Sequence, residues 1–202
     1  MKKGLVLCGV ALSALLIVGC GGDGPEYVDS SNSKQYASMG LDYHDIEKAA
    51  SDSVQSLLSS QQVNSMRSGK PKVLMISGVV NDTMQTIDTD QLSRKITRDM
   101  RNSGKFVLTL AQGEKTEKGI DMARTVRDND EFDQRTTIEK GNLKAAELSL
   151  SGKIVQKNTK VGSKQRTDYF FLLTLTNLKD GTVVWDDEVN IIKLGSNSSV
   201  TW

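Results

Sequence analysis

The sequence predicts a single α/β domain in which helices pack on one mixed β-sheet. Apolar residues recur at three- and four-residue spacing over 46–58 and again over 92–100, which is typical of amphipathic helices. A short, wholly apolar run lies between these two segments. The last fifty residues hold three apolar or alternating runs without a helical pattern between them, which predicts that the C-terminal part of the sheet is antiparallel.

The first 19 residues have the layout of a secretory signal peptide. Two lysines supply a basic start, and residues 5–18 are apolar but shorter than the about 20 residues that a membrane-spanning helix needs. The ending Ile17-Val18-Gly19-Cys20 resembles a bacterial lipoprotein box, in which the cysteine is diacylated and becomes the first residue. We expect a lipid anchor on Cys20, and the glycine after it favours the periplasmic side of the outer membrane. An ordinary signal peptide with an incidental cysteine is the alternative.

The composition excludes several classes of protein. Of 26 Lys and Arg residues, two fall in the signal peptide, which leaves 24 against 25 Asp and Glu. A near-neutral chain lacks the basic excess of a general nucleic-acid binder. Cys8 would leave with the signal peptide and Cys20 would carry lipid, so no internal disulfide can form. With one histidine, a metal site would need carboxylates, and we expect no cofactor and no structural zinc.

A tether and a helix open the mature chain. Residues 20–40 are rich in Gly, Ser, Asn and Asp, which predicts a flexible tether, and the folded domain is expected over 41–202. Asp42 is placed to cap the first amphipathic helix. The polar stretch 61–70 and the proline after it are expected to end this helix.

The first strand and the second helix follow. The apolar run 73–76 predicts a central strand covered on both faces, with a turn at 81–83. The second helix is expected to start at 88–89 and to end at 102–104, where glycine suits a left-handed cap. Residues 105–110 are expected to return as a strand.

The middle of the chain is expected to be less regular than its two ends. Residues 114–127 and 138–147 each predict a helix, and the charged stretch 128–135 between them predicts a solvated loop. Lys179-Asp180-Gly181 is a hairpin signal between the last two strands. The three C-terminal strands are expected over 148–156, 168–178 and 182–192.

Several of these landmarks resemble one family. They are the lipoprotein box, the run 73–76 with Asn81-Asp82-Thr83, the segment Asn102-Ser103-Gly104-Lys105-Phe106, and the Gly181 turn that leads to Trp185. The chain resembles the penicillin-binding protein activators of the LpoB type, over roughly residues 41–193. The resemblance implies a fold similar to the N-terminal domain of TolB and to part of the curli secretion lipoprotein CsgG.

The resemblance also implies a function without an active site. Such a lipoprotein binds a peptidoglycan synthase, a class A penicillin-binding protein, from the outer-membrane side and activates it, which regulates cell-wall synthesis and cell shape. Two features depart from the family pattern. The tether is short and holds one proline, Pro25, and the basic segment 157–166 is longer than the usual hairpin.

One local excess of charge is a candidate docking patch. Lys153 and four further basic residues occur in a short span without any acidic residue, whereas the chain as a whole is near neutral. Such a patch suits an acidic protein surface or peptidoglycan carboxylates, and a solvated loop is the alternative reading. The candidate partner-binding residues are Lys157, Lys160, Lys164 and Arg166.

Two other functional classes are compatible with parts of the sequence. A structural lipoprotein of an outer-membrane assembly, curli-secretion-like or flagellum-associated, is the alternative function and would self-associate. A periplasmic hydrolase is disfavoured because the sequence places no Ser or Cys nucleophile and no metal cluster with His44. Ser31-Asn32-Ser33-Lys34 matches the Ser-x-x-Lys motif of penicillin-interactive enzymes, but it lies in the expected flexible tether, where a nucleophile cannot be held beside its base. The stretch after Asp128 lacks the third ligand and the glycine of a calcium loop, and Gly104-Lys105 is a helix stop rather than a phosphate loop.

Overall fold

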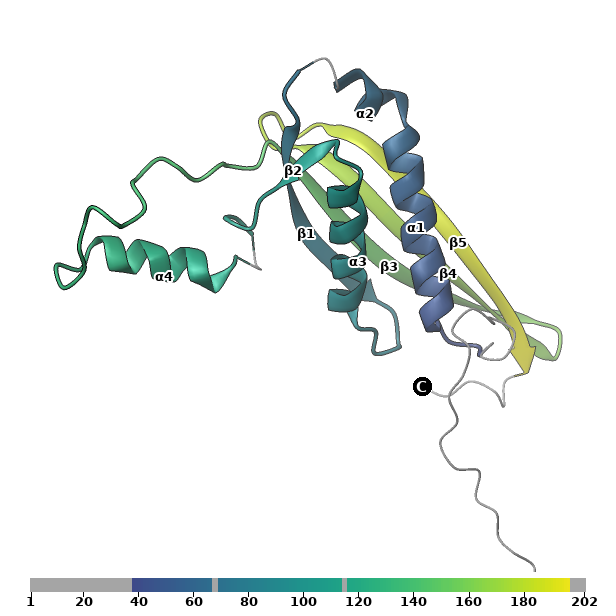
Figure 1. Cartoon of the computed structure of the whole chain (residues 1–202). Coiled ribbons are helices and arrows are strands. Elements are labelled where there is room, and N and C mark those ends of the chain that lie inside the picture. Colours follow the sequence, from purple (N-terminus) through teal and green to yellow (C-terminus); the bar gives the residue numbers. More distant parts are fainter. Residues whose placement is uncertain (1–37, 67–68, 114–115, 197–202) are drawn as a thin grey trace, which may run out of the picture. The chain divides into compact units, whose positions relative to one another are not determined.

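The computed structural model describes residues 38–66, 69–113 and 116–196, which belong to one compact unit. The expected signal peptide, Cys20 and most of the tether lie outside these residues. The described residues form one five-stranded sheet in the order β2-β1-β3-β4-β5, with two long helices packed on it (Figure 1). The strands are β1 (Lys72–Asp82), β2 (Phe106–Leu108), β3 (Leu148–Val161), β4 (Lys164–Asn177) and β5 (Val183–Ser196).

The sheet is mixed, as predicted. Strand β1 pairs in parallel with both β2 and β3, whereas β3, β4 and β5 pair antiparallel. Parallel neighbours need a crossover connection, and helix α3 (Thr89–Asn102) provides it between β1 and β2. The antiparallel strands are consecutive in the chain, so short turns suffice to join them. The predicted C-terminal antiparallel segment is therefore confirmed.

Helix α1 (Tyr43–Ser59) begins at the predicted cap. The Asp42 carboxylate accepts the Asp45 N–H at 3.0 Å, and the Asp45 carboxylate accepts the Asp42 N–H at 3.0 Å. This reciprocal pair is a capping box, which satisfies two backbone donors that the first turn leaves free. The buried residues Ala49 and Leu57 place the apolar side of α1 in the core.

The stretch that was expected to end the first helix holds a short second one. Helix α2 (Gln61–Ser65) begins at Ser60, whose hydroxyl accepts the Val63 N–H at 3.3 Å. Val63 is 2 % exposed and joins the core. The sequence prediction missed α2 because one apolar residue among polar ones carries no periodic signal.

Helix α3 starts and ends where the sequence predicted, at 88–89 and 102–104. Asp88 caps its start by accepting the N–H groups of Asp90 and Gln91 at 3.0 and 2.9 Å. The chain leaves the helix through Gly104, whose φ of +65° lies in the left-handed region that favours glycine. Three apolar residues of α3 are buried on one side, namely Leu92, Ile96 and Met100. Helices α1 and α3 lie side by side over the same face of the sheet (Figure 1).

The prediction that the run 73–76 is covered on both faces holds only in part, because helices cover one face of β1 and the other face is open beyond this run. Leu74 is fully buried on the face under the helices, whereas Val80 on the other face is 62 % exposed. Met75, also on the open face, is shielded by the loop after β2, because a Cβ on Gly113 would lie 2.8 Å from the Met75 methyl group. A short apolar run does not distinguish these two situations.

The basic segment after residue 156 is strand rather than loop. Strands β3 and β4 continue to Val161 and from Lys164, beyond their predicted ends, and are joined by the two-residue turn Gly162-Ser163. Gly162 has a φ of +61°, as the first central position of a type II′ hairpin turn requires. The strand predictions ended early because polar residues on both faces hide the alternation.

The middle of the chain contains one helix, not two. Helix α4 (Lys118–Arg127) lies within the predicted range and has no buried residue. The predicted helix over 138–147 is wrong, since that segment has no helical turn. Gly141 there has a φ of +87°, and Ile138 and Leu143 are 57 % and 47 % exposed. A positive φ at Gly141 breaks a right-handed helix within this segment, and the exposed Ile138 and Leu143 give it no packed apolar face.

The chain enters the domain through a set of fixed contacts. Met39 and Leu41 are buried, and the Gln85 amide accepts the Leu41 N–H at 2.8 Å and donates to the Leu41 carbonyl at 3.2 Å. The Tyr169 hydroxyl donates to the Met39 carbonyl at 3.3 Å. Burial, with the nearby Asp45 carboxylate, raises the pKa of Tyr169, so it stays a neutral donor.

Lys193 joins β5 to the start of α1. Its ammonium group donates to the Gly40 carbonyl at 2.8 Å and to the Asp42 carboxylate at 3.2 Å, and it pairs with Asp45. The Lys193 side chain is 14 % exposed. Burial opposes ionisation of Asp42, but the Asp45 N–H and the Lys193 ammonium outweigh it and hold the pKa of Asp42 below its usual value.

Candidate functional site

Three of the four candidate docking residues surround the tip of the β3–β4 hairpin without an ionic partner. Lys157 and Lys160 lie on β3, and Lys164 starts β4 directly after the turn. All three are exposed, and no other described residue forms an ion pair with them. They form a cationic tip, which we call the hairpin lysines.

The strand pleat divides the hairpin lysines between the two faces of the sheet. Ile154 points into the core under the helices, so Lys160 lies on the same side and Lys157 on the opposite, open side. Lys164 pairs with Val161 and therefore also lies on the open side. The sequence analysis grouped these residues in one short basic span. It could not predict which face of the sheet each side chain lies on, because the bounds of the two strands were unknown.

Arg166 has a structural partner. Its guanidinium donates to one oxygen of Asp168 from Nη2 at 2.9 Å and from Nε at 3.1 Å. The Asp168 side chain is only 7 % exposed, and its other oxygen has no hydrogen-bond partner. A buried carboxylate needs a cation beside it, so Arg166 is committed to Asp168 and is not a free docking charge.

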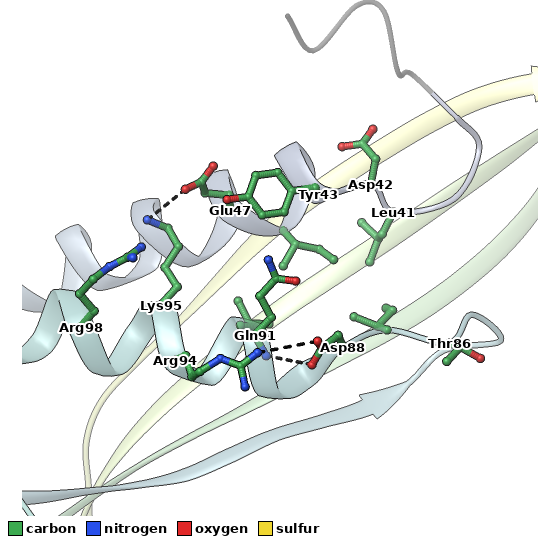
Figure 2. A pocket seen from close by; sticks show the side chains of 13 residues that line it. Leu41, Asp42, Tyr43, Glu47, Thr86, Asp88, Gln91, Arg94, Lys95 and Arg98 are labelled. Carbon is green, nitrogen blue, oxygen red and sulfur yellow. Dashed lines mark hydrogen bonds and ion pairs between the residues drawn. The ribbon is translucent and has the colours of Figure 1, made fainter. Parts of the chain in front are cut away.

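A groove opens between the first turns of α1 and α3, with a volume of about 430 Å³ (Figure 2). Its charged groups form ion pairs: Lys95 on α3 lies 3.5 Å from Glu47 on α1, across the groove, and Arg94 lies 3.9 Å from Asp88, the cap of its own helix. Because these charges compensate, the groove does not select an anionic or a cationic ligand. Its apolar lining consists of Leu41, Ile46, Ile87 and Leu92.

The segment Asn102-Ser103-Gly104-Lys105-Phe106, one of the landmarks of the family resemblance, has a structural role. Gly104 ends α3, and the Lys105 ammonium then donates to the Leu58 carbonyl in the last turn of α1 and to Asn64 Oδ1 at 3.0 Å. A cation at a helix C-terminus satisfies a free carbonyl and the helix dipole. Sequence reasoning identified this motif but not the contact across 47 positions that explains it.

The described residues do not contain a cluster of three or more His, Cys, Asp or Glu side chains that could hold a metal ion. The single histidine, His44, stacks edge-on against Tyr43 with ring centroids 5.9 Å apart. Within the part of the chain that the structure describes, no helix is long and apolar enough to cross a membrane.

A family model for the peptidoglycan-synthase activator LpoB matches residues 45–191, which is most of the folded domain. The chain belongs to the LpoB family. A comparison with curated proteins gives no match.

Solved structures of LpoB are also similar. The C-terminal domain from Salmonella enterica is 13 % identical, with a TM-score of 0.41 over 73 % of this chain and 98 % of that one. The corresponding Escherichia coli domain is 15 % identical, with a TM-score of 0.40 over 70 % and 97 %. The Escherichia coli LpoB structure from NMR is 12 % identical, with a TM-score of 0.39 over 96 % of each chain. The family assignment rests on the family model alone.

Proposed function

We propose that this member of the LpoB family is an outer-membrane lipoprotein that binds a class A penicillin-binding protein and activates it. The family model over residues 45–191 carries the proposal. Activation by binding needs a surface that fits the active conformation of the synthase better than the inactive one. Residues 1–19 act as the signal peptide in this proposal, and the chain that follows from Cys20 tethers the domain to the membrane.

Lipidation of Cys20 has a direct test. Cells fed labelled palmitate should incorporate the label into the wild-type protein and not into the Cys20→Ser variant. The variant should leave the membrane fraction, since several acyl chains at about 0.8 kcal/mol per buried methylene supply the anchor. Equal labelling of both proteins would exclude Cys20 as the acylated residue.

The hairpin lysines are the part of the docking surface that we propose from charge. Their exposed ammonium groups, which form no ion pair with any described residue, lie at one tip of a near-neutral domain, and such charges speed encounter with an acidic surface. Reversing Lys157, Lys160 and Lys164 to Glu should raise the Kd for the synthase about tenfold, at roughly 0.5 kcal/mol per exposed charge. The loss should appear mainly in the association rate and should shrink as salt is added.

The matched control reverses three exposed lysines elsewhere, namely Lys70, Lys144 and Lys179, none of which has an ion-pair partner among the described residues. This triple variant has the same net charge and should bind like the wild type. If the two triple variants weaken binding equally, net charge and not the hairpin tip determines the affinity, and the hairpin lysines are not part of the docking surface.

A further inference from the structure

The two edges of the sheet differ. Strand β2 forms one edge and has three residues, whereas β5 forms the other and has fourteen. Natural sheets protect their edges by keeping edge strands short or by covering them, because an open edge pairs readily with another strand. Among the residues that the structure describes, no strand pairs with the outer side of β5. The outer side of β5 is therefore a long strand edge that no described strand covers.

The hairpin geometry tells which backbone groups of β5 point outward. Val161 and Lys164 close a two-residue turn, so their N–H and C=O groups bond to each other across the β3–β4 pair. The direction alternates along β4, so Thr167 directs its groups toward its β5 partner, Lys193. Alternation along β5 then leaves the N–H and C=O groups of every second residue directed outward, namely Asp186, Glu188, Asn190, Ile192 and Leu194.

The side chains of these same residues lie on the open face of the sheet and divide the edge into two halves. Ile192 and Leu194 are 64 % and 55 % exposed, which is unusual for large apolar residues. Asp186 and Glu188 are exposed and have no ion-pair partner among the described residues. The edge thus presents free backbone groups with an apolar half and an acidic half.

A second copy of the chain fits this edge poorly. Helix α1 packs over β5, so two paired β5 strands about 4.8 Å apart would bring two α1 helices together, although packed helix axes need about 8–10 Å. An antiparallel two-fold pairing over the length of the strand would also place Glu188 opposite Ile192. A single extended strand without a helix above it meets neither obstacle.

We propose that the outer edge of β5 binds an extended segment of a partner protein as a sixth strand. The segment runs antiparallel to β5, which is the more stable pairing. Its alternate side chains are apolar where they face Ile192 and Leu194 and basic where they face Asp186 and Glu188, because direct cross-strand neighbours share a face. This mode of recognition takes affinity from main-chain hydrogen bonds and specificity from alternate side chains. It goes beyond the proposed function and does not depend on it.

The test uses the full mature chain and a synthetic peptide. The peptide carries valines facing Ile192 and Leu194, lysines facing Asp186 and Glu188, and threonines elsewhere. Amide hydrogen exchange measured by NMR should slow at least tenfold on peptide addition at Glu188, Asn190, Ile192 and Leu194. The amides of Val189, Ile191 and Lys193, which already bond to β4, should not change. A peptide with glutamates in place of the lysines should bind at least tenfold more weakly.

Two variants separate edge pairing from other contacts. Asn190→Pro removes an outward N–H that β4 does not use and should abolish the protection. If this variant fails to fold, Ile192→Lys should weaken peptide binding at least tenfold, whereas Val80→Lys, at an equally exposed apolar position on β1, should not.

Three outcomes would overturn the proposal. Outward amides that are protected in the free protein at every concentration would mean that the chain covers its own edge. Protection that grows with protein concentration would mean that a second copy is the occupant. Slowing that spreads equally over the inward and outward amides would exclude addition of a strand.

Discussion

Lys193→Met is expected to lower the free energy of unfolding by about 3 kcal/mol, because breaking a buried ion pair leaves an uncompensated charge. Lys193, Asp42 and Asp45 are 14 %, 17 % and 20 % exposed, and the Gly40 carbonyl would lose its donor as well. The same substitution also releases the start of α1 from β5. For a domain of this size the loss corresponds to a fall in Tm of roughly 6–12 °C.

The stability difference between the wild type and Lys193→Met should depend on pH. The pKa of Asp42 is lower in the folded state than its ordinary value of 3.8. Its contribution is therefore fully present above about pH 5 and is lost as the pH falls through the lowered pKa. Urea unfolding between pH 7 and pH 2 should show the two proteins converging in acid.

Lys179→Met is the matched control, since Lys179 lies exposed in the β4–β5 turn without an ion-pair partner among the described residues. It should change the free energy of unfolding by less than about 0.5 kcal/mol. A loss equal to that of Lys193→Met would show that removal of any lysine charge destabilises the domain. A difference between Lys193→Met and the wild type that stays constant down to pH 2 would contradict the role of Asp42.

Leu74→Ala is expected to have a similarly large effect. Leu74 lies in β1 with no exposed surface, and the truncation leaves a cavity in a core that cannot fully collapse. The expected loss is about 3–4 kcal/mol, measured by urea unfolding.

Val80→Ala on the same strand is the comparison for Leu74→Ala. Val80 is 62 % exposed on the open face, and its truncation should cost less than about 0.5 kcal/mol. Two similar losses would mean that β1 is covered on both faces in solution, in contradiction to the one-sided packing.

The parts of the fold that the sequence predicted are those with a local physical signal. The Asp42 and Asp88 caps, the Gly104 stop and the Gly181 turn follow from side-chain hydrogen bonds and from the freedom of glycine at positive φ. The apolar periodicity over 46–58 and 92–100 predicted α1 and α3 as amphipathic helices.

The remaining features depend on contacts that are distant in sequence. Nothing local in β1 shows that helices cover only one of its faces. Nothing local shows either that the loop at Gly113, far along the chain, shields Met75 on the other face. Nothing near Lys193 in the chain indicates Asp42, and the Lys105 contact with α1 is equally hidden. The pairing of Arg166 with Asp168 is the exception, because these residues are two positions apart and only the burial of Asp168 depends on the fold.

The candidate site was predicted as a set of basic residues and not as a surface. The span without acidic residues correctly located a cationic hairpin, but its division between two faces required the register of β3 with β4. The free edge of β5 could not be predicted from the sequence, because an edge strand and an inner strand of this composition show the same pattern of residues.

We propose that this protein activates a peptidoglycan synthase by binding it. The most direct measurement is the rate of glycan polymerisation by a purified class A penicillin-binding protein from the same envelope, with and without the mature chain. We expect a several-fold rise in rate that saturates with added protein, and the variant with Glu at 157, 160 and 164 should need a higher concentration to reach it. A rate that does not change at any concentration, although the two proteins bind, would contradict activation.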